Sequence, residues 1–597
     1  MTDQDDDKTS GIKSFSVGLG DGSQRPGART PPPAFRVLIF GDFAAKQGTS
    51  AEITGKDMAE LLEQFSPTLT VEAENLLGSL PAVLSEELSF TRPRDFKPAN
   101  LVKQFQFTSD IKTALAAGGA QGLRDAGQRF DKIAGLISRT GAAASTSQAQ
   151  SSSGDHAPNT ASPQTPMASP ADGGTGEDDG LDALFSMVDA PKKSPDSPQT
   201  QDLAKQAVEA FLSQTTSGTP SQKAQDDGVS AASGTPEAEA ALTAQSLLFL
   251  KDKRLSLVLE NWLSLKTLLN ELPRETSIRL FLVQVDTDMP AEEAASLLEG
   301  NGSLLATAAF DILLCANRQA LQKAGAQDLK RYAALAAEHA SCVFAGLFPD
   351  FAGLPATDLG LLDTPHTLLE GTGFEHFSSL RQSEPAGSLG LFWNDGVTTA
   401  AAEDQPAAYM PSAWIALLAL LRGQAADGWP SLPQGERLEI DDLETTERNA
   451  KGRVFADSVL AHVTPDAAES LASAGINALQ GQANRTSVYF GSARVARSVS
   501  DDAQDGRANL THALSLGRLN TLLQVAFSEA PPDAADMSGT VARLQDQLNL
   551  LSDGLMDRVR FQVTADTDED GDNVLDIDAT VAGVPGITKP FGFRIGL

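Results

Sequence analysis

The 597-residue sequence contains only two cysteines, Cys315 and Cys342. Both lie in apolar runs typical of buried strands, FDILLCAN and SCVFAGLF. Two isolated cysteines exclude a disulfide framework and a cysteine-ligated metal site, because both need several cysteines at suitable spacings. The low cysteine content therefore predicts a protein of a reducing compartment, the cytoplasm.

Positive charge is also scarce. The chain carries 46 Lys and Arg against 79 Asp and Glu, which gives a formal net charge of −33. Such a chain repels phosphate groups and gains nothing from releasing counterions. Neither a nucleic acid nor an anionic membrane is an expected partner.

Long hydrophobic runs are absent as well. The longest strongly apolar run, Trp414 to Leu421, is far shorter than the roughly 20 residues of a membrane-spanning helix. The first ten residues, MTDQDDDKTS, are acidic, whereas a signal peptide starts with basic residues followed by an apolar stretch. The sequence thus predicts a soluble cytoplasmic protein without membrane insertion.

Motifs of catalysis and cofactor binding are missing too. The six histidines are scattered, with no His-Glu-x-x-His pattern, and the chain has no Gly-x-Ser-x-Gly elbow and no ATPase loop. The glycine-rich segment 18–22, GLGDG, is interpreted as a turn because no Lys-Ser/Thr follows it. We therefore expect neither an enzyme nor a cofactor.

One acidic turn resembles a calcium loop. Its twelfth position is Ile577 instead of a bidentate Glu, and strands are predicted on both sides of it. An acidic hairpin tip is the simpler interpretation, and a calcium-dependent binding protein is a further alternative. The candidate calcium ligands occupy alternating positions: Asp566, Asp568, Asp570 and Asp572.

Apolar residues make up 41% of the chain, enough for several folded units. Strand and helix patterns alternate, which is typical of an α/β (mixed α+β) fold with a largely parallel sheet. Two Ser/Gly/Pro-rich stretches, up to residue 180 and again at 215–241, predict disorder. The predicted units are an acidic disordered N-terminus (1–11), an α/β domain (12–138), a disordered linker (139–180), short amphipathic helices with flexible arms (181–238), and two α/β domains (239–440 and 441–597).

Apolar residues after the linker recur at i, i+3, i+4 and i+7, which predicts one apolar face on a short helix. A helix between disordered arms has no local core, so this face should dock on a partner or back onto its own chain. We call the four residues the linker stripe: Leu181, Leu184, Phe185 and Val188.

In the first α/β unit a strand pattern, IKSFSVGL, precedes an apolar strand that ends LIFGDF. A later helix start reads SFTRPRDFKPANLVKQF. This arrangement resembles the small sheath subunit of bacterial type VI secretion systems (TssB/VipA-like), in which the second strand ends Leu-Gly-Asp-Phe.

Seven further motifs follow along the chain in this order: LDALFSMVD, LAKQAVEAFL, LENWLSLKTLL with Trp262, IRLFLVQV, AAFDILLCAN, FEHFSSLRQSEPAGSLGLFW and ESLASAGINAL. Residues 181–597 are thereby similar to the large sheath subunit of the same systems (TssC/VipB-like). The whole chain resembles a fusion of the two subunits, with two or three sheath-type domains joined by a disordered linker.

The resemblance implies a structural subunit of a contractile sheath. Such subunits polymerise by exchanging terminal strands around an inner tube and contract to propel it. The implied partners are further copies of the chain, the inner tube protein, baseplate components and, through the linker stripe, a ClpV-type AAA+ unfoldase. The terminal strands available for pairing between subunits contain Phe15, Val17 and Leu19 at one end and Phe591, Phe593 and Ile595 at the other.

A second interpretation is a sheath paralogue that does not polymerise and acts as a cap, an adaptor or a baseplate-associated component. The family's His-His-containing segment is replaced here by LLFLKDKRLSLVLENW. The long C-terminal helices of the small subunit also have no counterpart before the linker.

Overall fold

A computed structural model gives the fold of most of the chain. The predicted strand at 12–19, the linker at 139–180 and the linker stripe lie outside the residues that it describes. The described residues are 33–55, 58–136, 236–273, 277–401, 406–450, 452–498, 508–553, 555, 558–567, 573–587 and 589–596.

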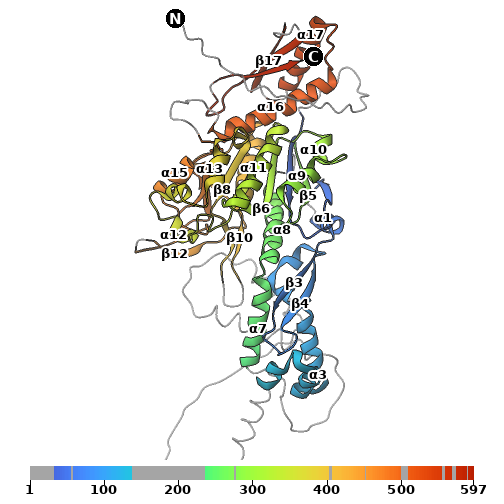
Figure 1. The fold of residues 1–597 in the computed structure, drawn as a ribbon, viewed down its shortest axis with the longest axis vertical. Coiled ribbons are helices and arrows are strands. Elements are labelled where there is room, and N and C mark those ends of the chain that lie inside the picture. Colours follow the sequence, from blue (N-terminus) through green and yellow to red (C-terminus); the bar gives the residue numbers. More distant parts are fainter. Residues whose placement is uncertain are drawn as a thin grey trace, which may run out of the picture.

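A nine-stranded mixed sheet forms the centre of the molecule (Figure 1). Its strands in chain order are β1 (Phe35–Gly41), β2 (Ser50–Ile53), β5 (Ile278–Gln284), β6 (Ile312–Gln319), β7 (Cys342–Leu347), β8 (Leu389–Trp393), β11 (Leu438–Glu439), β14 (Ile476–Gly481) and β15 (Ser487–Phe490). In space the order is β11-β15-β14-β8-β7-β6-β1-β5-β2. Neighbours from β14 to β5 are parallel, and β2, β15 and β11 add antiparallel edges.

Strand β1 comes from the N-terminal part of the chain but lies inside this sheet. It pairs in parallel with β5 on one side and with β6 on the other. Its sequence, FRVLIFG, is a nearly continuous apolar run, as expected for a parallel strand buried on both faces. Strands from three of the predicted domains, 12–138, 239–440 and 441–597, therefore share one sheet.

Helices cover both faces of the sheet, which gives an α/β/α arrangement and confirms the predicted mixed α/β class. The apolar run 414–421 lies in a buried helix, and within the described residues no helix combines the length and hydropathy needed to span a membrane. One face packs against α8 (Lys253–Glu271) and α14 (Ser412–Asp427); the other packs against α9 (Ala291–Glu299), α11 (Lys323–Glu338), α13 (Glu375–Gln382) and α15 (Pro465–Ser473).

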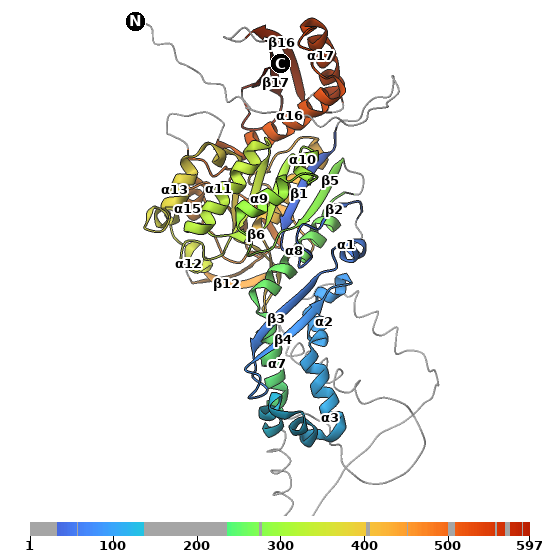
Figure 2. The ribbon, with the colours of Figure 1, turned by 45° about the vertical axis from the view of Figure 1, so that its right-hand side comes forward.

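A narrow extension projects from one end of the sheet (Figures 1 and 2). It is built from β3 (Thr68–Glu74), β4 (Val83–Ser89), α2 (Pro98–Gln104), α3 (Gln106–Asp125) and α7 (Pro236–Leu250), and α1 (Met58–Phe65) lies at its base beside β2. The buried carboxylate of Glu86 on β4 accepts hydrogen bonds from the backbone N–H groups of Gln106 and Phe107. Glu86 thereby satisfies free donors at the start of α3.

Helix α7 corrects one prediction. It begins at Pro236, inside the stretch that composition predicts to be disordered up to Ala241. The sequence there, PEAEAALTAQ, has proline at the first helical position followed by strong helix formers. Its C-terminal end packs against the start of α3 through Phe249, whose ring contacts Phe105 and Phe107.

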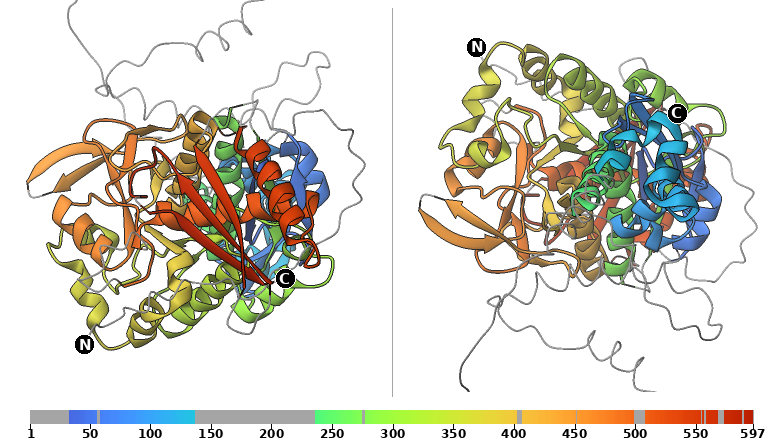
Figure 3. Two further views of the ribbon diagram at one scale, coloured as in Figure 1. Left: turned by 90° about the horizontal axis from the view of Figure 1, so that it is seen from above. Right: turned by 90° about the horizontal axis from the view of Figure 1, so that it is seen from below.

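The opposite end of the molecule carries a C-terminal unit of two helices and three strands (Figure 3). These elements share a separate hydrophobic core. The predicted hairpin around the acidic turn and the predicted final strand are both present. The elements are α16 (Leu510–Glu529), α17 (Met537–Asp553), β16 (Val559–Thr567), β17 (Asn573–Val581) and β18 (Phe591–Gly596).

Short elements complete the fold. The hairpin of β12 (Thr446–Ala450) and β13 (Arg453–Asp457) protrudes from the side of the sheet, as Figure 3 shows. The others are β9 (Gly396–Thr399), β10 (Ala408–Met410), α10 (Leu304–Thr307), α12 (Ala356–Leu359) and the 3-10 helices η1 (Pro93–Phe96), η2 (Gly127–Arg129), η3 (Pro365–Glu370) and η4 (Glu384–Ser388).

Candidate assembly site

The C-terminal sheet has the antiparallel order β16-β17-β18, so β16 and β18 are its two edges. Apolar and polar residues alternate along each strand, which turns one face toward α16 and α17 and leaves the other exposed. The buried face contributes to the separate core through Val559, Phe561, Val563, Leu575, Ile577, Ala579, Phe591 and Phe593.

A side chain closes the outer edge of β16. The amide of Gln545, on α17, donates to the backbone carbonyl of Phe561 at 2.9 Å and accepts from the N–H of Val563 at 2.9 Å. These are the two hydrogen bonds with the backbone of β16 that a neighbouring strand would form at this position. The Gln545 amide therefore occupies a pairing point that another chain would need.

The outer edge of β18 is open. The N–H of Ala582 donates to the carbonyl of Arg558, so even-numbered residues of β16 point toward β17. Because an antiparallel strand alternates its hydrogen-bonding direction, odd-numbered residues of β17 and β18 bond to each other. The backbone groups of Gly592, Arg594 and Gly596 thus point outward, and no hydrogen bond from a described residue reaches them.

The predicted exchange strand at the C-terminus pairs within its own chain. Phe591 and Phe593 are buried, Ile595 is half-buried, and they lie opposite Ala579, Ile577 and Leu575 of β17. The candidate N-terminal exchange residues Phe15, Val17 and Leu19 lie outside the described residues, as do all four residues of the linker stripe: Leu181, Leu184, Phe185 and Val188.

The candidate calcium turn is described only in part. Asp568, Asp570 and Asp572 lie outside the described residues. The Asp566 carboxylate lies 3.3 Å from Arg594 Nη2, and Asp576 lies 3.7 Å from Arg594 Nε. Elsewhere in the described chain, no group of three or more His, Cys, Asp or Glu is placed to hold a metal ion.

Helix α16 connects the C-terminal unit to the start of β1. The Arg518 guanidinium donates to the carbonyls of Pro33 at 2.6 Å and Ala34 at 3.3 Å, and lies 3.4 Å from Asp311. Both charged side chains are buried, and burial raises the pKa of Asp311 against the opposing effect of Arg518. The first described residues, Pro33 and Ala34, therefore lie beside α16, a helix of the C-terminal unit.

A buried polar network follows β1 at the carboxyl end of the parallel strands. The Asp42 carboxylate accepts from Arg254 Nε at 2.9 Å, from Gln284 Nε2 at 3.1 Å and from the N–H of Ala44 at 2.9 Å. Burial by itself raises the pKa of Asp42, but these hydrogen bonds outweigh it and hold the pKa below its usual value. The Asn317 side chain accepts from the N–H of Asp42 at 2.9 Å.

A second buried cluster lies at the end of β6. Arg318 forms ion pairs with Glu260 on α8 and with Asp395, which follows β8. Burial opposes the charged form of Arg318, but the two carboxylates outweigh it and raise its pKa. Asp395 also accepts from the N–H of Ser412 at the start of α14. This cluster therefore ties the helices of one face to the sheet.

The two cysteines are buried in β6 and β7, as their apolar surroundings predict. Burial raises the pKa of the Cys315 thiol to about 12 and raises that of Cys342 as well. Both thiols are therefore protonated and unreactive at neutral pH.

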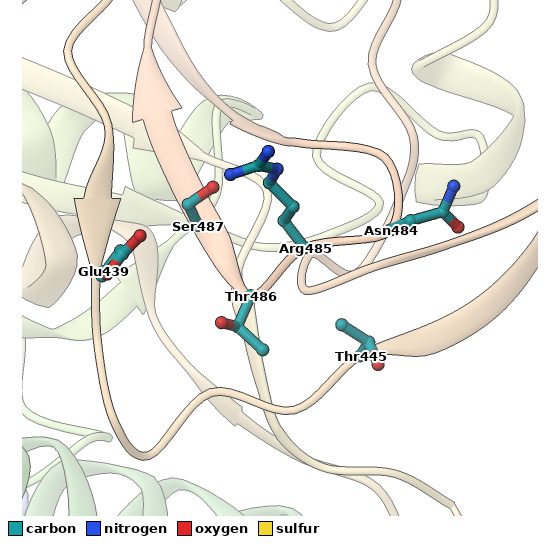
Figure 4. A pocket seen from close by; sticks show the side chains of 6 residues that line it. All are labelled: Glu439, Thr445, Asn484, Arg485, Thr486 and Ser487. Carbon is teal, nitrogen blue, oxygen red and sulfur yellow. The ribbon is translucent and has the colours of Figure 1, made fainter. Parts of the chain in front are cut away.

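Two surface hollows lie near the outer edge of the large sheet. The first is a shallow polar pocket of about 400 Å³ between β11 and the turn before β15 (Figure 4). Its lining includes Glu439, Asn484, Arg485 and Thr486, all of which are exposed. The second is a more apolar groove of about 570 Å³ beside the β12–β13 hairpin.

Comparisons with known proteins give distant structural similarities alone. No model of a known protein family matches the sequence, and no curated protein sequence matches it. Among solved structures, a sheath tail protein from Listeria innocua is similar over 46% of this chain and 60% of its own chain, with 13% identity and a TM-score of 0.25. The function proposed below therefore rests on the residues of this chain.

The sequence did not identify Gln545, which closes the edge of β16, or Arg518, which anchors α16 beside β1. Gln545 lies on a polar helix position that nothing distinguishes from its neighbour Asn549. Arg518 is a single arginine within an apolar helix. Because a buried arginine is almost always paired, this position indicated an ion pair.

Proposed function

We propose that this chain is a structural subunit of a contractile sheath in a type VI secretion-like injection apparatus. It polymerises by pairing terminal strands between copies around an inner tube, and contraction of the polymer propels the tube. The observation that carries the proposal is the C-terminal sheet with one closed and one open edge.

An open edge strand binds an extended segment of another chain through backbone hydrogen bonds, and this pairing depends little on side-chain identity. At β18 the outward groups belong to Gly592, Arg594 and Gly596, so two of three positions have no side chain. Glycine in a strand is typical of places where another backbone approaches closely. The predicted strand at 12–19 of a neighbouring copy is the proposed occupant.

Because Gln545 closes the edge of β16, strands can add to the C-terminal sheet at the β18 edge alone. Each C-terminal sheet can accept one strand, at β18, instead of one at each side. Such an interface joins unlike surfaces of successive copies and generates a ring or an open helical array. No active site is required. The inner tube protein, baseplate components and a ClpV-type unfoldase at the linker stripe remain proposed partners.

The alternative is a sheath paralogue that caps or adapts an assembly without polymerising. The pairing of β18 within its own chain favours it, because the isolated chain already fills the position next to β17. The two proposals differ in whether copies of this chain bind one another.

Negative-stain electron microscopy of the full-length protein, alone and with a candidate tube protein, tests the proposal. A variant lacking Thr588–Leu597 serves as the comparison. We expect tubes or rings from the full chain that vanish on truncation. Monodisperse particles under all conditions would contradict the polymer and favour the adaptor.

A further inference from the structure

The groove beside the β12–β13 hairpin is an exposed apolar hollow in a strongly acidic protein. We define the hairpin groove by Leu361, Arg453, Val454, Phe455 and His462, which line a volume of about 570 Å³. Val454 is 69% exposed, the largest exposure among the large hydrophobic side chains of the described residues. The adjacent Leu362 is also exposed, at 37%.

Basic groups border this apolar surface. The Arg453 guanidinium makes no ion pair or hydrogen bond with a described residue. The His462 ring packs edge-on against Phe455 with 4.7 Å between ring centroids, and its Nδ1 lies 3.6 Å from the buried carboxylate of Asp457. The groove thus offers an apolar floor with the Arg453 cation at its rim, although the whole chain has a net charge of −33.

We propose that the hairpin groove binds residues 177–189 of the same chain, with the linker stripe against its apolar floor. This inference is independent of the sheath proposal. The sequence of the segment is EDDGLDALFSMVD, which carries acidic residues around the stripe. No Lys or Arg occurs between Arg139 and Lys192. The acidic residues of the segment are therefore opposite in charge to Arg453 at the groove rim.

The chain length permits this docking. The undescribed stretch starts after Leu136 and ends before Pro236, both in the narrow extension. Figures 1 and 2 place β12 on the side of the sheet that faces α7. A random coil of about 45 residues has an r.m.s. end-to-end distance of about 37 Å. Tethering gives the segment an effective concentration on the order of 1 mM, so a Kd well below about 1 mM is enough to fill the groove.

Disulfide trapping in the full-length protein tests the proposal. The variant pairs Leu184→Cys with Val454→Cys, and the two native cysteines do not interfere because both are buried. The control pairs Leu184→Cys with Val83→Cys, which is 49% exposed at the β3–β4 hairpin near the linker ends. Cross-linked monomer is quantified on a non-reducing gel after mild oxidation at low protein concentration.

We expect at least a tenfold higher yield of cross-linked monomer for the groove pair than for the control pair. Adding Phe185→Asp or Arg453→Glu should lower that yield severalfold, whereas Ser186→Asp, off the stripe, should leave it unchanged. Equal yields for the two pairs would overturn the proposal. Disulfide-linked dimers without cross-linked monomer would also overturn it, because a second copy would then fill the groove.

Discussion

Strands β1 and β18 lie near opposite ends of the described chain and are held in opposite ways. Strand β1 is enclosed between β5 and β6, and its ends are fixed by the buried Arg518–Asp311 pair and the Asp42 network. Strand β18 has one neighbour, and its outer backbone groups face solvent. Of its nearest ion pairs, that from Arg594 to Asp566 is exposed and that to Asp576 is half-buried.

This difference between β1 and β18 indicates that one strand stabilises the fold and the other is available for association. Burying β1 joins the N-terminal part permanently to the large sheet, so the two parts fold as one body. Leaving β18 at an edge keeps backbone donors and acceptors available to another chain. Stability should therefore depend on the surroundings of β1, and association on the surroundings of β18.

The largest expected effect on stability is at Arg518. Replacing it in Arg518→Met leaves Asp311 buried without a counter-ion and removes the donor to Pro33 and Ala34. We expect a loss of about 3–5 kcal/mol in the free energy of unfolding, measured by urea denaturation. Adding Asp311→Asn should restore part of this loss.

The matched control is Arg594→Met at β18. Its ion pairs are exposed or half-buried, so we expect a change of about 1 kcal/mol or less. Similar losses for the Arg518 and Arg594 variants would remove the distinction between the two strands.

A smaller effect is expected at Asp42. The hydrogen bonds to its carboxylate hold the folded-state pKa below the unfolded value of about 3.9. This contribution is therefore fully present above about pH 4 and is lost as the pH falls through the folded pKa. Asp42→Asn should lower stability at pH 7 by about 1–3 kcal/mol and flatten the acid limb of the stability curve.

The Asp42 test is read from urea midpoints between about pH 2 and pH 7, a range that spans the unfolded pKa. Asp566→Asn, at the exposed pair with Arg594, is the control and should change the acid limb little. An unchanged pH profile in Asp42→Asn would show that the carboxylate does not stabilise the position of β1.

The smallest effect on stability is expected at Gln545. Gln545→Leu removes the side-chain amide from the edge of β16, and we expect a loss of about 1 kcal/mol because water can replace it. Hydrogen exchange of residues 559–567 should become faster. Gln562→Leu, on the exposed face of the same strand, should leave that exchange unchanged.

Strands β1 and β18 also show which parts of the fold can be predicted from the sequence. The apolar run at 35–43 and the alternation at 591–595 predict a buried strand and a half-buried strand, and the structure confirms both. Strand β3 is missing from the predicted elements although Leu69 and Val71 alternate with polar residues.

The local sequence pattern does not predict which strands pair with one another in the folded chain. The N–H of Phe43 donates to the side chain of Gln284, 241 residues away, and periodicity cannot place β1 between β5 and β6. The same holds for Gln545, because closure of an edge depends on which helix packs beside the strand.

The outer edge of β18 gives the most direct test of strand-linked assembly. Gly592→Pro removes one outward N–H and leaves the pairing with β17 intact, since edge strands tolerate proline where the N–H faces solvent. Phe593→Pro, which removes an inward N–H, is the control for damage to the sheet. Electron microscopy and sedimentation should show tubes or rings for the parent and monodisperse particles for Gly592→Pro, with unchanged hydrogen exchange at 559–567. Assembly of Gly592→Pro like the parent would contradict the account.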